Sequence, residues 1–177
     1  MVEKWEIILL LTDIFDADEL FRTKIQKMIY FASQKELMDN SFDRGYYGPY
    51  SSEIANNLQT MVEGRYLEER CHYFVNGYIG YSYNLTQDGR ELIPVLRENN
   101  PREFLILKDI VKVCRNKNSD ELSKAAKIHF IVKKSGSKMT DDDIIRSAKD
   151  FKWNISKEDL DSAIELLLDL DLIKVNS

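Results

Sequence analysis

The chain has few of the residues that form flexible linkers or metal sites. Its 177 residues include 7 Gly, 3 Pro, 2 Cys and 2 His. Scarce Gly and Pro exclude a low-complexity or disordered chain, because such segments are rich in both residues. Cys71 and Cys114 are far apart and form no Cys-x-x-Cys pair. We therefore expect two reduced, buried thiols in a protein that stays in the cytoplasm.

Long hydrophobic runs are also missing. The apolar stretch at residues 5–11 is too short to span a bilayer. It lacks a small-residue cleavage site and continues into Asp13, Asp16 and Asp18, which is unlike a signal peptide. The stretch predicts a buried first helix, and no membrane partner is expected.

The signatures of catalysis are absent as well. The sequence has no nucleophile elbow, HExxH, Walker A or dinucleotide fingerprint. His72 follows Cys71 without further ligands at zinc spacing, and His129 has apolar neighbours one helical turn away, which favours packing. The acidic residues 141–143 coincide with a predicted helix start, where anions are stabilised. We therefore expect a protein that is not an enzyme, with no catalytic residues, no metal and no cofactor.

What the chain does have is an ordinary globular composition with an uneven charge. Hydrophobic residues make up 44%, charged residues 31%, and the formal net charge is −5. Residues 1–100 are acidic, whereas residues 108–138 contain nine Lys and Arg against three Asp and Glu. The basic segment has two interpretations: a solvated helix face, which is the more usual one, or a contact surface for a nucleic acid or an acidic protein.

The first hundred residues predict helices, one hairpin and another helix. Helical periodicity and caps place helices at about 4–13, 17–38, 51–63 and 86–97. Asp16 or Asp18 caps the second helix, and Gly64 is the expected left-handed stop of the third. Strand formers at 65–85 surround an Asn76-Gly77 turn. Pro94 is expected to kink or end the fourth helix. This order is that of a winged helix, with the hairpin as its wing.

The remainder predicts a helical unit. Helices are expected at about 102–114 and 119–133, followed by two that start at Thr140 and Ser156 with capping boxes. A strand-like stretch at 172–175 ends the chain. This last helix and strand weakly repeat residues 52–67, so a second helix-turn-helix from a duplication is one interpretation; the other is that helix–turn–strand is simply common. The fold class is therefore mainly α with a small β-hairpin, comprising a winged-helix-like domain at 1–100 and a helical domain at 101–177 packed on it.

Three strings resemble known families. They are Lys24-Ile25-Gln26-Lys27-Met28-Ile29-Tyr30-Phe31, Tyr47-Gly48-Pro49-Tyr50-Ser51-Ser52-Glu53 and Leu85-Thr86-Gln87-Asp88-Gly89. The chain resembles the Panacea (SocA-like) antitoxin domain over its first hundred residues, and more closely the YwgA-like proteins over most of its length. The turn departs from the Panacea pattern, which favours Gly-Pro-Val. The resemblance implies a winged-helix module that contacts a toxin or another protein.

Two binding functions follow as hypotheses. In the first, a non-catalytic antitoxin-like or adaptor module binds a protein partner through the aromatic turn and the third helix, using Tyr46, Tyr47, Tyr50, Asn56, Asn57 and Gln59. In the alternative, a winged-helix transcriptional regulator, which could be a homodimer, contacts DNA through segment 108–138, using Lys124, Lys127, Lys133, Lys134 and Lys138. The third helix, which would read DNA in such a regulator, contains no Lys or Arg.

Overall fold

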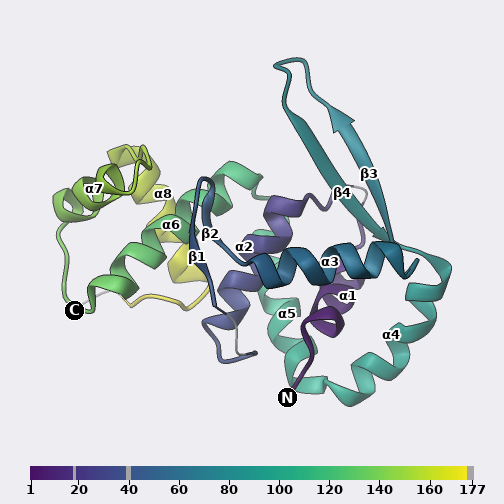
Figure 1. Ribbon diagram of the computed structural model, residues 1–177. Helices are drawn as coiled ribbons and strands as arrows, with labels where there is room; N and C mark the ends of the chain where they lie inside the picture. Colours follow the sequence, from purple (N-terminus) through teal and green to yellow (C-terminus); the bar gives the residue numbers. More distant parts are fainter. Residues whose placement is uncertain (18, 39–40, 175–177) are drawn as a thin grey trace.

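The computed structural model describes residues 1–17, 19–38 and 41–174 (Figure 1). In these ranges eight helices and two antiparallel hairpins follow one another as α1 (Lys4–Phe15), α2 (Arg22–Ser33), β1 (Asp43–Gly45), β2 (Gly48–Tyr50), α3 (Ser52–Glu63), β3 (Leu67–Tyr73), β4 (Ile79–Leu85), α4 (Gln87–Asn99), α5 (Pro101–Cys114), α6 (Ser119–Ser135), α7 (Asp141–Asp150) and α8 (Lys157–Asp169). The prediction of a mainly helical protein with a little β structure is confirmed.

Helices α1 and α2 form the centre of the molecule. Residues 7–11 of α1 are fully buried, as the apolar run predicted. α1 contacts α3, α4 and α5, while α2 contacts α5, α6 and β2. All of the helices named here contribute side chains to one hydrophobic cluster. No helix within the described ranges has both the length and the apolar character needed to cross a membrane.

The second helix is shorter than predicted. It begins at Arg22 because the two residues before it are extended along β4: the carbonyl of Leu20 accepts from the backbone N–H of Tyr83 (3.1 Å), and Phe21 bridges Ser82. This pairing between distant segments overrides the local helical periodicity. The predicted cap Asp18 lies outside the described residues. The helix ends at Ser33 rather than near residue 38.

The third helix is confirmed, but its predicted stop is wrong. Ser51 accepts a hydrogen bond from the N–H of Ile54 (3.3 Å), as an N-cap does. Gly64 has a right-handed φ of −73°, and Arg65 takes the left-handed conformation instead, with φ of 64°. The helical turn closes one residue later than predicted because the N–H of Tyr66 reaches back to Met61 (2.9 Å).

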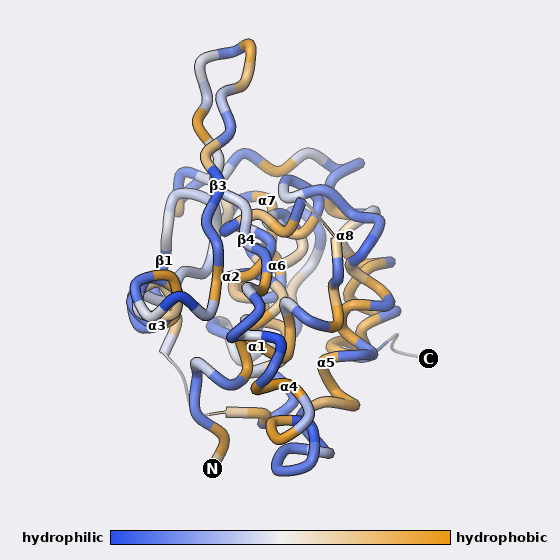
Figure 2. Tube along the Cα trace, turned by 90° about the vertical axis from the view of Figure 1, so that its right-hand side faces the viewer, coloured by the Kyte–Doolittle hydropathy of each residue, from blue (hydrophilic) through white to orange (hydrophobic). Residues whose placement is uncertain are grey.

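The long hairpin is confirmed and the short one was not predicted. β3 pairs with β4 from Leu67↔Leu85 to Tyr73↔Ile79, and Gly77 turns the chain with φ of 80°. Figure 2 shows this hairpin projecting from the body, with apolar residues at its end. Cys71 is exposed on it, contrary to the prediction of a buried thiol, because the projecting hairpin does not pack both faces on the core; Cys114 is buried.

The first turn of α4 approaches the start of β3 very closely. Thr86 caps α4 by accepting from the N–H of Gly89 (3.1 Å) and donates its own hydroxyl to the carbonyl of Arg65 (2.6 Å). A Cβ at Gly89 would lie 2.2 Å from the carbonyl oxygen of Tyr66. Gly89 therefore permits an approach that a side chain would block. The helix continues past Pro94 to Asn99.

The C-terminal helices start as predicted but no strand follows them. The capping boxes of α7, with Thr140 and Asp143, and of α8, with Ser156 and Asp159, are both present. The predicted strand is wrong for residues 172–174, because the chain turns back on α8: the N–H of Leu172 donates to the carbonyl of Leu167 (3.0 Å). Val175, the last residue of that predicted strand, lies outside the described residues.

Candidate functional site

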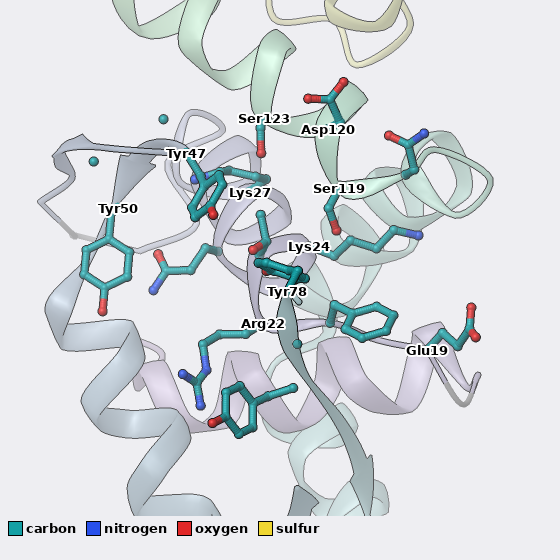
Figure 3. Close-up of a pocket in the computed structure, with 18 of the residues that line it drawn as sticks. Glu19, Arg22, Lys24, Lys27, Tyr47, Tyr50, Tyr78, Ser119, Asp120 and Ser123 are labelled. Atoms are coloured by element: carbon teal, nitrogen blue, oxygen red, sulfur yellow. The ribbon is translucent and has the colours of Figure 1, made fainter. Parts of the chain in front are cut away.

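A cleft of about 1470 Å³ opens between the two hairpins (Figure 3). The β1–β2 turn forms one wall, the end of the β3–β4 hairpin forms the other, and the first turns of α2 and α6 lie between them. The site is thus assembled from segments that are distant in the sequence.

Exposed aromatic side chains form both walls. Tyr46, Tyr47 and Tyr50 are 83%, 49% and 42% exposed on the short hairpin. Across the cleft, Phe74 and Tyr78 are 43% and 44% exposed at the end of the long hairpin. Large aromatic groups that remain open to solvent on two facing walls are typical of a surface that binds another molecule.

The floor of the cleft joins two of the strings on which the resemblance rests. Gln26 of α2 donates to the carbonyl of Ser51 (2.9 Å) and accepts from its N–H (3.0 Å). Lys27, the next residue, donates to the carbonyl of Pro49 (2.7 Å). The Gln-Lys pair therefore fixes the Tyr-Gly-Pro turn to α2 through backbone groups, which sets the position of the tyrosine wall.

The same helix binds α6 through a buried tyrosine–histidine pair. The hydroxyl of Tyr30 lies 2.8 Å from Nδ1 of His129. Burial lowers the pKa of His129 to about 4, and the charge of Lys133 acts in the same direction, so the imidazole is neutral near pH 7. The prediction of a packed histidine is confirmed.

Cations outnumber carboxylates in the lining. The five cationic side chains are Arg22, Lys24, Lys27, Arg115 and Lys127, and the two acidic ones are Glu19 and Asp120. Arg22 pairs with Glu69 (3.0 Å), and Arg115 donates to the carbonyls of Ile14 and Phe15 at the end of α1. The cleft is thus electropositive in a protein whose overall charge is negative.

Lys27 and Lys127 have no carboxylate bonded to them among the described residues. Lys27 is only 2% exposed. Its burial, together with the charge of Lys127, lowers its pKa to about 7. Burial also lowers the pKa of Lys127, whose ammonium lies 5.7 Å from the ring centre of Trp153. The like charge of Lys127, which acts on a buried amine with no bonded carboxylate among the described residues, is an electrostatically unfavourable arrangement.

The predicted protein-contact residues lie in two places. The three tyrosines line the cleft, whereas Asn56, Asn57 and Gln59 lie on α3 outside it. Asn57 donates to the carbonyl of Glu53 (2.9 Å), and Gln59 donates to the carboxylate of Glu63 (3.0 Å). The side chains of Asn57 and Gln59 therefore bond within their own helix.

The lysines predicted to contact nucleic acid are divided among different environments. Lys124 bonds to the carboxylates of Asp120 (2.9 Å) and Asp159 (2.7 Å), while Lys127 lines the cleft. At the other end of α6, Lys133 donates to Gln34 (2.6 Å), and Lys134 lies over the rings of Phe130 and Phe151. Lys138 is exposed on the loop before α7. Segment 108–138 does not present these charges as one surface.

Sequence reasoning missed Lys27, Phe74 and Tyr78 as site residues. The aromatic residues flanking Asn76-Gly77 were visible, but only the fold shows that this end faces the tyrosines. A signal for Lys27 was present too. Residues three and four positions after it are Tyr30 and Phe31, so its side of α2 is also apolar and a central helix was indicated.

The long hairpin is anchored to α2 by a charged network at its base. Arg22 donates to the hydroxyl of Tyr83 (2.8 Å), which in turn donates to the carboxylate of Glu69 (2.5 Å). Tyr83 is almost fully buried. These contacts hold the second wall of the cleft in place.

Glu69→Gln is expected to lower the free energy of unfolding by about 1–3 kcal/mol, because the charge that Arg22 and Tyr83 share is removed from a partly buried network. Urea denaturation measures the change. Glu68→Gln, one residue away and paired with exposed Arg70, should change it by less than about 0.5 kcal/mol. Equal effects of the two substitutions would contradict the anchoring role.

The fold and the site define a mainly helical protein with an aromatic-walled, lysine-floored cleft between two hairpins. No protein-family model matches the chain. Over 76 residues it is 34% identical to the uncharacterized protein YwgA of Bacillus subtilis strain 168, a stretch that covers 42% of this chain and 45% of that protein. The match thus spans less than half the length of its curated relative. This partial similarity supports a YwgA-like relationship.

Proposed function

We propose that this protein is a non-catalytic binding module that accepts a segment of a partner protein in the cleft. The observation that carries the proposal is the pair of facing walls with large exposed side chains, all uncharged: Tyr46, Tyr47 and Tyr50 on one hairpin, and Phe74 and Tyr78 on the other. Aromatic residues of this kind are enriched at protein interfaces and supply most of their binding energy.

Winged-helix architecture is part of the proposal. The order α1, α2, α3, β3–β4 hairpin, α4 supports it, with the hairpin as the wing. The end of the wing, residues 74–78, contains no basic side chain to contact phosphates, and Arg70 nearer its base is paired with Glu68. On α3, Glu53 pairs with Lys4 (2.7 Å). These features favour an antitoxin-like or adaptor role, with a toxin as one class of partner, over a dimeric DNA-binding regulator.

Photo-crosslinking tests which molecule enters the cleft. Benzoylphenylalanine at position 47 replaces one aromatic side chain by another on the wall. Leu105 of α5, which is 60% exposed and outside the lining, is the matched control position. In cells of the native organism, illumination is expected to join position 47, and not position 105, to one protein species.

The other outcomes are equally informative. If nuclease treatment removes the crosslinks at position 47, the molecule that enters the cleft is a nucleic acid and not a protein. Identical products at both positions, or none at either, would show that the cleft is not a binding site. The substitution Tyr78→Ala, on the opposite wall, should weaken the specific crosslink because it removes one of the two exposed aromatic side chains of that wall.

A further inference from the structure

The floor of the cleft contains a pair of lysines that suits an anion. Lys27 comes from α2 and Lys127 from α6. Burial lowers the pKa of both amines, and the charge of Lys127 lowers that of Lys27 further. Figure 3 shows Lys27 within the cleft, near Tyr47 and Ser123. The stem of Lys127 lies against the β1–β2 turn, since a Cβ at Gly48 would be 3.1 Å from its Cγ.

The groups around Lys27 leave its charge without compensation. β2 supplies only the carbonyl of Pro49, which takes one of three possible hydrogen bonds. From α6, Lys127 adds a like charge. The carboxylate of Asp120, also on α6, raises the pKa of Lys127 but is itself bonded to Lys124 (2.9 Å). Among the described residues, none bonds a carboxylate to Lys27.

We propose that Lys27 and Lys127 form an anion subsite for a single carboxylate of the partner's segment, supplied by an Asp or Glu side chain or by the chain terminus. This inference rests on the proposed function and specifies the chemistry of the segment: one acidic group directed to the floor, between aromatic or apolar residues that contact the tyrosine and phenylalanine walls.

A carboxylate fits the subsite better than a phosphate. Two ammonium groups offer enough charge for a monoanion. Lys can bind phosphate as a point charge, but geometrically specific phosphate sites add the bidentate fork of Arg or several backbone N–H groups. Arg22, the nearest guanidinium on α2, is already engaged by Glu69 and Tyr83. Glu19 and Asp120 at the cleft also repel a polyanion.

Binding of the carboxylate would be linked to protonation of Lys27. The folded protein holds this amine with a pKa of about 7, and a nearby negative charge favours its protonated form. The carboxylate would therefore bind more tightly below pH 7 than at pH 9, where Lys27 is neutral.

The experiment uses the full chain with ¹³C-labelled lysines and follows the Cε signals by NMR during a pH titration. Lys27 is identified by the signal missing from Lys27→Met and, independently, from Lys27→Gln. The probes are sodium acetate and inorganic phosphate, each compared with chloride at constant ionic strength. Acetate is expected to raise the titration midpoint of Lys27 by about one pH unit or more.

Two variants distinguish the subsite from general screening. Lys127→Gln should raise the acetate concentration needed for the shift several-fold, whereas Lys138→Gln, on an exposed loop outside the lining, should leave it unchanged. An unchanged Lys27 midpoint in acetate overturns the subsite, as does a stronger response to phosphate than to acetate. Either result leaves the crosslinking outcome at position 47 intact, so failure of the subsite is separable from failure of the cleft.

Discussion

Lys27→Met is expected to stabilise the protein by about 2–4 kcal/mol at pH 7. Folding transfers this amine from water to a site where it is 2% exposed and has no bonded carboxylate among the described residues. A methionine of similar length needs no charge compensation there. The variant does lose the hydrogen bond to Pro49, which costs about 1 kcal/mol, and the net effect remains a gain.

The pH dependence gives the sharper test. The pKa of Lys27 is about 7 in the folded protein against 10.5 for the free side chain. Between these values the unfolded chain binds the extra proton, so the wild type gains stability as pH rises, by up to about 5 kcal/mol across the window. The advantage of Lys27→Met should be complete at pH 7 and below, and should vanish near pH 10.5.

Urea denaturation of both proteins from pH 6 to 10 measures this difference, because the tyrosines that also titrate are common to the two. Lys133→Met is the control, since Lys133 is exposed and donates to the side chain of Gln34. Two results would contradict a charged, uncompensated Lys27. One is a Lys27→Met protein that is less stable than the wild type at pH 7. The other is a variant whose free energy of unfolding rises with pH as steeply as that of the wild type. A stabilised variant would show that Lys27 lowers the free energy of unfolding of the wild type.

Gly89→Ala is expected to lower the free energy of unfolding by about 2–4 kcal/mol, as overpacking against backbone does. The sign is opposite to helix propensity, which favours Ala over Gly by about 1 kcal/mol within a helix. The reason is the carbonyl oxygen of Tyr66, which would lie 2.2 Å from the new Cβ. Neither group can move unless α4 shifts away from the start of β3.

Thermal or urea unfolding measures the Gly89→Ala effect. Gln87→Ala, two residues earlier on the same helix and exposed, is the control and should change the stability by less than about 0.5 kcal/mol. A neutral or stabilising Gly89→Ala would mean that α4 is free to adjust and that the close approach does not constrain the fold.

The predictable part of this fold is the part determined by neighbours in the sequence. The capping boxes at Thr140 and Ser156 and the Asn76-Gly77 turn each need only a few consecutive residues, and each is present. Residues 172–174 of the predicted strand turn back on α8, whereas Leu20 and Phe21 lie along β4, a strand much later in the chain. Local patterns do not contain such pairings.

Only one wall of the cleft could be predicted from the sequence. The exposed tyrosines were selected from the sequence, and they do line it. Their opposite wall and the lysine floor depend on how three distant segments meet at α2, which periodicity does not specify. Lys27 in particular is charged, so composition places it on the surface, whereas the fold buries it.

The contacts of Gln26 with Ser51, Lys27 with Pro49 and Gly89 with Tyr66 have a consequence for the descent of this architecture. All three involve backbone atoms of the opposite residue, so they constrain chain geometry and leave the side chains of the rim unconstrained. Homologues that keep these three backbone contacts keep the backbone geometry of the cleft. Substitutions at Tyr46 or Tyr78 then have little effect on the stability of the fold. Homologues can therefore bind different partners with the same backbone geometry of the cleft.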